Sequence, residues 1–177
     1  MAQIKTVYHG STTLFNQIDV TQGKPYKDFG RGFYVTENPN HGKNLALRNK
    51  RIETERYGHN AQAYLYTYTL DLAQCKQMLK VREFSTADES WMGFVLNNRK
   101  SRGCDHAYDM VLGPTADDVT SLVLKAYFDG LYGEVNTSHA IATAIRLIEA
   151  DKLPPQIFFA TNAAAAYLQQ QGDVRIL

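Results

Sequence analysis

The sequence DFGRGFYVT, residues 28–36, brings two glycines, an Asp–Arg pair and two adjacent aromatic residues into nine positions. Residues 33–35 (Phe-Tyr-Val) predict a β-strand, because aromatic and β-branched side chains suit a pleated, half-buried surface. Glycines just before a strand, here Gly30 and Gly32, mark a turn, a bulge or a close approach to the backbone. The stretch therefore predicts either a β-bulge before a core strand or a loop that lies against a ligand.

The composition predicts one domain with no bulk charge. A chain of 177 residues can bury one substantial core and is short for two ordinary domains, so we expect a single domain over residues 1–177. Lys and Arg number 19 against 18 Asp and Glu. The formal net charge of +1 gives no general attraction to nucleic acid or to membranes.

The cysteines and the N-terminal residues favour a cytoplasmic location. Cys75 and Cys104 have no metal-like spacing and favour a reducing environment. The start of the chain, MAQIKTVYHGSTT, lacks an apolar run of signal-peptide length, and no stretch of about 18 apolar residues occurs. We therefore expect a cytoplasmic protein that makes no use of a membrane, with export by a route without a cleaved signal as the alternative.

Local patterns predict strands at both ends of the chain with helices between them. Strands are expected at residues 4–10, 15–20, 33–36, 63–70, 107–114, 154–161 and 174–177. Helices are expected at residues 41–58, 90–100, 116–133, 136–153 and 162–171, the second after a Thr86–Glu89 capping box. This irregular order predicts a mixed α+β domain rather than a doubly wound parallel sheet. Neither a dinucleotide-binding G-x-G-x-x-G opening a helix nor a P-loop is present.

Three segments together resemble a known superfamily: YHGS at 8–11, GRGFYVT at 30–36 and QIFFAT at 156–161. They resemble the ADP-ribosyltransferase fold of the diphtheria-toxin and poly-ADP-ribose-polymerase type, whose signature is a His, a Tyr and a late Glu or a substitute. Within it, the chain is similar over nearly its whole length to a bacterial family with the pattern YHGS, DFGxGFYxT, YDxVxGPxADD and QIxFxT. The resemblance implies a split β-sheet core with flanking and inserted helices, and NAD as co-substrate.

The same resemblance assigns roles to individual residues. His9 is expected to hydrogen-bond the adenosine ribose hydroxyls, and the Gly10 backbone to pair with the nicotinamide carboxamide. Tyr34 is expected to lie against the nicotinamide ring, where an aromatic face suits positive charge. Further NAD-binding positions implied are Ser11, Gly32, Phe33 and Thr36. On this reading the glycines at 30 and 32 let the loop fold over the ligand.

Gln156 stands where many relatives have Glu, and with His9 and Tyr34 it completes the expected catalytic set. Glutamine keeps hydrogen bonding to the ribose but loses the negative charge that favours an oxocarbenium-like state. Removing one such preorganised contact costs about 10² to 10³ in rate in other enzymes. We therefore expect transfer of single ADP-ribose units rather than polymer synthesis, with a non-catalytic NAD or ADP-ribose binding module, or an NAD glycohydrolase, as alternatives.

The expected acceptor is a macromolecule, with protein favoured over nucleic acid because the net charge is nearly neutral. A basic stretch in the first helix could instead contact phosphate, although it is more often a solvated face. That stretch contains Arg48, Lys50, Arg51 and Arg56. Compact relatives often act as bacterial toxins, so an antitoxin protein is an expected partner.

Other reactive residues favour structural roles. Asp28 is expected to have a structural role, for which a local loop ion pair with Arg31 is one candidate; contact between Arg31 and the NAD pyrophosphate is the other, and the role of Arg31 is left open. Acidic residues in a helix's first turn suit its dipole, so we expect no metal in YDMVLGPTADD, which holds Asp109, Asp117 and Asp118. Asp109 is expected to shape the acceptor side. The histidines form no zinc-like helical pair, and Cys104 and His106 are too close in sequence for a catalytic pair.

Overall fold

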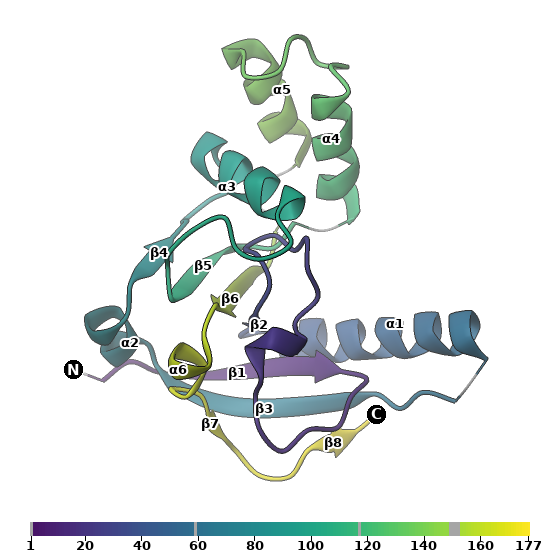
Figure 1. The fold of residues 1–177 in the computed structure, drawn as a ribbon, viewed down its shortest axis with the longest axis vertical. Coiled ribbons are helices and arrows are strands. Elements are labelled where there is room, and N and C mark those ends of the chain that lie inside the picture. The colour runs from purple at the N-terminus through teal and green to yellow at the C-terminus, as the bar shows by residue number, and fades with distance from the viewer. Residues whose placement is uncertain (1, 59, 117, 149–152) are drawn as a thin grey trace.

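A computed structural model describes residues 2–58, 60–116, 118–148 and 153–177, and it shows two four-stranded sheets (Figure 1). In the first sheet, β3 (Tyr64–Asp71) lies between β1 (Ile4–Ser11) and the short strands β7 (Gln169–Gln170) and β8 (Arg175–Ile176). The second sheet has the order β2 (Phe33–Val35), β6 (Pro155–Phe159), β5 (Met110–Pro114) and β4 (Val81–Glu83). The predicted α+β class is confirmed.

The longer helices lie outside the two sheets, whereas α6 adds Ala164 and Ala165 to the core between them. Figure 1 shows α1 beside the first sheet and α3, α4 and α5 grouped beyond the second. Their bounds are α1 Pro39–Tyr57, α2 Leu72–Met78, α3 Glu89–Lys100, α4 Asp118–Phe128, α5 Ser138–Ile148 and α6 Asn162–Ala165, with a 3₁₀ turn at Val20–Gln22. Within the described residues, no helix combines the length and apolarity needed to cross a membrane.

An isolated β bridge joins the two sheets. Tyr8 in β1 exchanges both backbone hydrogen bonds with Thr36, just after β2, at 2.8 and 3.0 Å. Side chains of successive strand residues point to opposite faces, and the two cores follow this alternation. Phe33 lies in the core between the sheets, whereas Tyr34 packs against the core beneath α3 and α5.

Most predicted strands are present, but the one expected at residues 15–20 is wrong. Those residues form a loop and the start of the 3₁₀ turn. The alternation arose because Phe15, Ile18 and Val20 turn into the core between the sheets. The Tyr66 hydroxyl accepts from the Phe15 N–H at 2.7 Å, so a side chain replaces a neighbouring strand.

The helix predictions are also corrected in detail. The N-cap of α3 is Asp88, which accepts from the Trp91 N–H, and not Thr86. The helix expected at 162–171 ends at Ala165, and β7 follows. Helix α2 and strand β4 were not predicted. The part of the expected 136–153 helix at residues 149–152 lies outside the described residues.

Candidate functional site

His9 lies near the end of β1, on the face that looks toward the second sheet. Its ring stacks on Phe33 with centroids 4.2 Å apart and meets Phe15 edge-on at 5.9 Å. Its Nδ1 lies 2.7 Å from the Tyr34 carbonyl oxygen. Because a carbonyl can only accept, Nδ1 carries the proton and the neutral ring keeps Nε2 as an acceptor. Burial lowers the His9 pKa to about 4, against the opposing effect of the bond to Tyr34, so the ring is neutral at pH 7.

Gly10 is buried where β1 meets α1. A Cβ atom at this position would lie 2.0 Å from the Gly42 carbonyl oxygen, so only glycine fits under the helix. The Tyr8–Thr36 bonds show that even-numbered residues of β1 direct their backbone groups away from β3. The Gly10 N–H therefore points toward the Tyr34 side, and no described residue accepts a hydrogen bond from it. A buried N–H without a partner is costly unless something else binds it.

Tyr34 serves as a clamp on the preceding loop. Its hydroxyl donates to the Gly30 carbonyl at 2.7 Å and accepts from the Phe29 N–H at 3.1 Å. Its ring packs against Phe158, with centroids 4.9 Å apart. Burial, reinforced by the nearby Asp28 carboxylate, raises the Tyr34 pKa well above its usual value. The His9 side chain thus lies between the two sheets, whereas the Tyr34 side chain lies on the far face of the second sheet. The two residues are joined only through the Tyr34 carbonyl.

Gln156 and Asp28 form the centre of a buried polar network. Asp28 Oδ1 accepts from Arg99 Nη2 at 2.8 Å and Nε at 3.0 Å, while Oδ2 accepts from Ala116 N at 2.9 Å and Gln156 Nε2 at 3.0 Å. The structural role expected for Asp28 is confirmed, but the candidate partner Arg31 does not pair with it. The partner is Arg99, which α3 brings from 71 positions away.

Arg31 instead binds backbone carbonyls within its own loop. Its Nε donates to Gly23 O at 3.0 Å, and its Nη2 donates to Thr21 O. These bonds hold the chain after the 3₁₀ turn against the start of β2. The guanidinium is thereby bonded to the loop backbone, although Arg31 is exposed.

The glycines at 30 and 32 are required by close packing. Gly30 has φ +98°, and a Cβ there would lie 2.7 Å from Cys104 Sγ. A Cβ at Gly32 would lie 2.3 Å from the Phe158 ring. Both positions therefore favour glycine because neighbouring groups approach the loop backbone closely, one of the causes predicted from the sequence. That the two glycines let the loop fold over a ligand stays a prediction.

Residues of the 101–108 segment complete the clamp on this loop. His106 donates from Nε2 to Phe29 O at 2.9 Å, while its Nδ1 accepts from Tyr108 N. Cys104 Sγ contacts Arg31 O at 3.4 Å, and burial raises the Cys104 pKa. Both side chains therefore contact the backbone of the 28–36 loop.

The remaining predicted NAD-binding residues surround the His9 end of β1. Ser11 Oγ accepts from the Thr13 N–H at 3.0 Å and shapes the turn after the strand. Phe33 forms the ring under His9, and buried Thr36 donates from Oγ1 to Pro155 O at 3.2 Å. The structure thus groups His9, Ser11 and Phe33 on one side and Tyr34 and Gln156 on the other.

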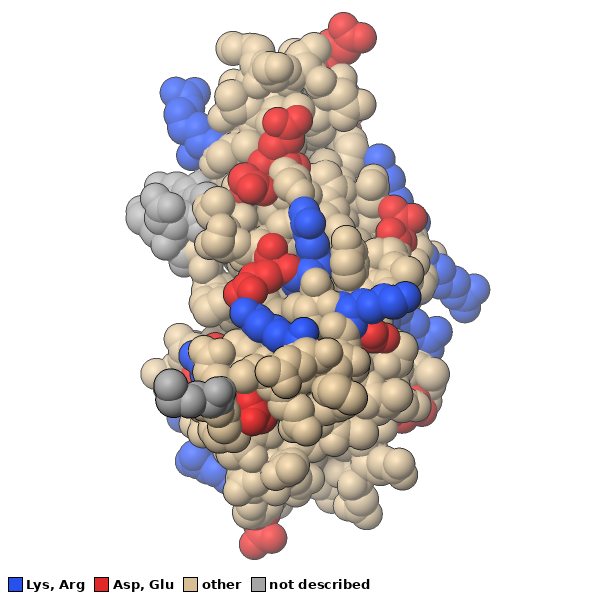
Figure 2. Space-filling model, turned by 90° about the vertical axis from the view of Figure 1, so that its left-hand side faces the viewer, with Lys and Arg blue, Asp and Glu red and all other residues tan. Residues whose placement is uncertain are grey.

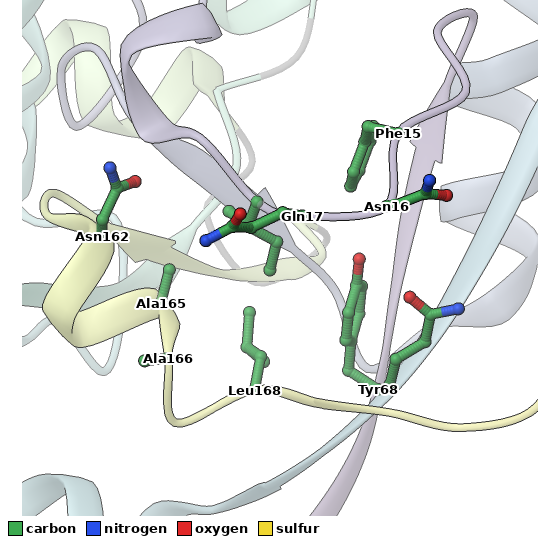
Figure 3. Close-up of a pocket in the computed structure, with 10 residues that line it drawn as sticks. Phe15, Asn16, Gln17, Tyr68, Asn162, Ala165, Ala166 and Leu168 are labelled. Carbon is green, nitrogen blue, oxygen red and sulfur yellow. The ribbon is translucent and has the colours of Figure 1, made fainter.

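A cavity of about 230 Å³ lies beside Phe15, one of the rings that contact His9. Figure 3 shows Phe15 and Tyr68 at one end and Asn162 at the other. The side-chain amides of Asn16, Gln17, Asn162 and Gln170 also line it. Phe15 lines this cavity and also contacts the His9 ring, so the cavity lies near His9.

No metal site is supported within the described parts of the chain, where no group of three suitable ligands converges. Asp109 Oδ2 accepts from the Lys80 N–H at 2.9 Å and ties β5 to the residue before β4. Asp117 and the side chain of Asp118 lie outside the description.

Comparison with known proteins places the chain in a family. The chain belongs to the family described as protein of unknown function (DUF3990), whose sequence model matches residues 5–170. Neither curated proteins nor solved structures gave a significant match.

Proposed function

We propose that the protein is an NAD-dependent mono-ADP-ribosyltransferase that modifies a macromolecule. The observation that carries this proposal is the buried Gly10 N–H, which points to the Tyr34 side without a partner. A carboxamide oxygen would satisfy this donor. The resemblance in the YHGS, GRGFYVT and QIFFAT segments supports the same assignment.

His9 suits the ribose contact proposed for it. The neutral ring is fixed by Tyr34, so Nε2 can accept a hydrogen bond from a sugar hydroxyl at pH 7. The cavity beside Phe15 has aromatic faces and uncharged amides, which suit an uncharged base such as adenine. Neither the His9 ring nor the amides of the cavity need to change their charge when the ligand binds.

In the proposed reaction a nucleophile of the acceptor bonds to the ribose C1′ as the bond from C1′ to nicotinamide breaks. Nicotinamide leaves with the bonding electron pair, and the acceptor's proton passes to solvent. The protein positions the two partners and stabilises the developing oxocarbenium charge. Gln156 contributes hydrogen bonding but no charge at this step.

One observation favours the alternative of a non-catalytic NAD or ADP-ribose binding module. The Gln156 amide nitrogen is already bonded to Asp28, so the glutamine has a structural partner where relatives have an acid. An NAD glycohydrolase would share the site but transfer to water. An antitoxin partner and a toxin role belong to the first proposal alone.

The test uses purified protein and NAD labelled in the adenylate moiety, with and without a cell lysate. Released nicotinamide and label on macromolecules are followed in parallel for wild type, His9→Phe and an exposed control, His139→Phe. Protease- or nuclease-sensitive label that His9→Phe loses and His139→Phe keeps would support the transferase and reveal its acceptor class. Nicotinamide release without label would indicate a glycohydrolase, and binding without release a binding module. Absence of NAD binding would refute all three.

A further inference from the structure

The outer edge of β1 is divided by its bridge to Thr36. Even-numbered residues direct their N–H and C=O groups to this edge, as Tyr8 does. Beyond Tyr8 on one side lies the buried Gly10. On the other side lie Ile4 and Thr6, whose side chains are exposed, and no described residue pairs with their outward backbone groups.

A groove runs beside this unpaired half of the edge. It encloses about 560 Å³, within the range of ligand-binding clefts. Its walls come from β1, α2, the segment after β4 and the adjoining ends of β5 and β6. Its apolar floor consists of Leu72, Phe84, Leu112 and Ile157, each at most 9% exposed.

The charges at the groove are balanced in pairs. Lys5 Nζ lies 2.9 Å from Glu37 Oε2, and Lys76 Nζ lies 2.6 Å from Glu83 Oε2. Figure 2 shows basic and acidic side chains interspersed over the side of the molecule that carries α2 and β4. Such a surface offers no field for a polyanion and leaves the backbone edge and the apolar floor as the recognition elements.

The other described edges carry the usual protection against strand addition. β4 has three residues, two of them Arg82 and Glu83, and β7 and β8 have two residues each. β2, the other edge of the second sheet, has three residues, and its free side faces β1, where His9 Nδ1 donates to Tyr34 O and Thr36 pairs with Tyr8. The edge of β1 at Ile4–Val7 has a single charge, Lys5, and that charge is paired with Glu37. Among the described strands, the outer edge of β1 at Ile4–Val7 therefore lacks the protection that the other edges have.

We propose that an extended peptide segment of a partner protein adds to the outer edge of β1 at Ile4 and Thr6, antiparallel to β1, with alternate uncharged side chains in the groove. The Tyr8–Thr36 pair already shows an antiparallel neighbour on this edge, and the added strand continues that register. Strand addition takes affinity from backbone hydrogen bonds and specificity from pockets for alternate side chains. The inference does not rest on NAD binding, although Gln156 also lines the groove.

A displayed library of random dodecapeptides, selected on the full-length protein, supplies the probe. The chosen peptide is synthesised and its affinity measured for wild type, Thr6→Pro and Thr6→Ala. Proline removes the outward N–H without breaking the β3 ladder, because an edge position tolerates it. Alanine keeps the N–H. Loss of one or two backbone bonds should weaken binding about tenfold in Thr6→Pro and leave Thr6→Ala near wild type.

Amide hydrogen exchange of the wild-type protein is a second test, which does not depend on whether Thr6→Pro folds. In wild type, the bound peptide should slow exchange at Ile4 and Thr6, while Lys5 and Val7, already bonded to β3, change little. Protection confined to other segments, equal binding by Thr6→Pro, or no selected peptide would overturn the proposal. Concentration-dependent dimerisation that Thr6→Pro abolishes would also overturn it, since a second copy would then be the occupant.

Discussion

The His9 ring donates a hydrogen bond from Nδ1 to the backbone carbonyl of Tyr34 across a distance of 2.7 Å. The two positions that the sequence pairs by resemblance are therefore joined, but through a carbonyl and not through facing side chains. This contact fixes the tautomer of His9 and the path of β2 at once. It also makes the ring sensitive to protonation, because the charged form would be buried.

His9 should make stability depend on pH. Its folded pKa of about 4 lies below the ordinary 6.5, so the unfolded chain binds a proton first. Stability from this group is complete above pH 6.5 and is lost as pH falls toward 4, by about 3 kcal/mol in all. Urea unfolding of wild type and His9→Phe across pH 4–8 measures it.

The comparison between wild type and His9→Phe isolates the contribution of His9 to the pH dependence of stability. Burial also lowers the pKa of His41 and His106, and these groups remain in both proteins. The advantage of wild type over His9→Phe should shrink with acidification. A stability difference that is constant with pH would show that His9 does not titrate in this way.

Asp28→Ala should destabilise the fold by about 3 kcal/mol, because Arg99 would be left largely buried without its carboxylate. Ala116 N and the Gln156 amide would lose their acceptor as well. Chemical denaturation gives the change in unfolding free energy. Asp19→Ala is the matched control, since this exposed carboxylate caps only the short 3₁₀ turn and should cost about 1 kcal/mol or less. Equal losses would contradict a central role for the Asp28 network.

Local sequence patterns predicted those parts of the fold that local chemistry determines. The alternating run in β3 and the Gly58 that ends α1 with φ +68° are both readable from neighbouring residues. β4 was missed because its three residues pair in parallel with β5, a contact that no local pattern reveals. α2 was missed because it follows β3 without an intervening loop. Asp71, whose side chain caps α2, was a signal in the sequence that could have revealed this helix.

The candidate site was predictable in its residues but not in its contacts. The glycines and aromatic residues of 28–36 indicated close approach, and the structure confirms close packing at Gly30 and Gly32. Arg99 was not singled out, because its partner Asp28 lies far away in sequence and α3 must first be placed. The residues that clamp the loop, such as His106, likewise meet it only in three dimensions.

Two glycine substitutions should have opposite effects. Gly10→Ala would place a methyl group 2.0 Å from the Gly42 carbonyl, so α1 must shift, and overpacking of this kind costs about 1–3 kcal/mol or more. Gly93 lies inside α3, and a Cβ added there would meet no heavy atom within 4 Å outside the helix's own backbone. Gly93→Ala should therefore stabilise the fold by about 0.5–1 kcal/mol. Thermal unfolding of both variants gives the sign. A stable Gly10→Ala would refute the direct contact between β1 and α1.

Gln156→Glu tests the structural and the chemical role of this position together. The new carboxylate would stand about where Nε2 now donates to Asp28 Oδ2 at 3.0 Å, so two negative charges would face each other in a buried site. The new carboxyl should keep its proton to a higher pH than an ordinary glutamic acid. Because its folded pKa would be raised, the variant should match wild type best in acid and lose stability as pH rises, by about 1–3 kcal/mol at pH 8.

Gln156→Met is the control for this experiment, since it removes the hydrogen bond without adding charge and its loss should not depend on pH. Unfolding free energies of both variants from pH 5 to 8, with nicotinamide release measured on the same samples, separate the two roles. A pH-independent loss in Gln156→Glu would contradict the contact with Asp28. Faster nicotinamide release at pH 8, despite the lower stability, would show that the missing charge limits the proposed reaction; unchanged release would place Gln156 in the structural network alone.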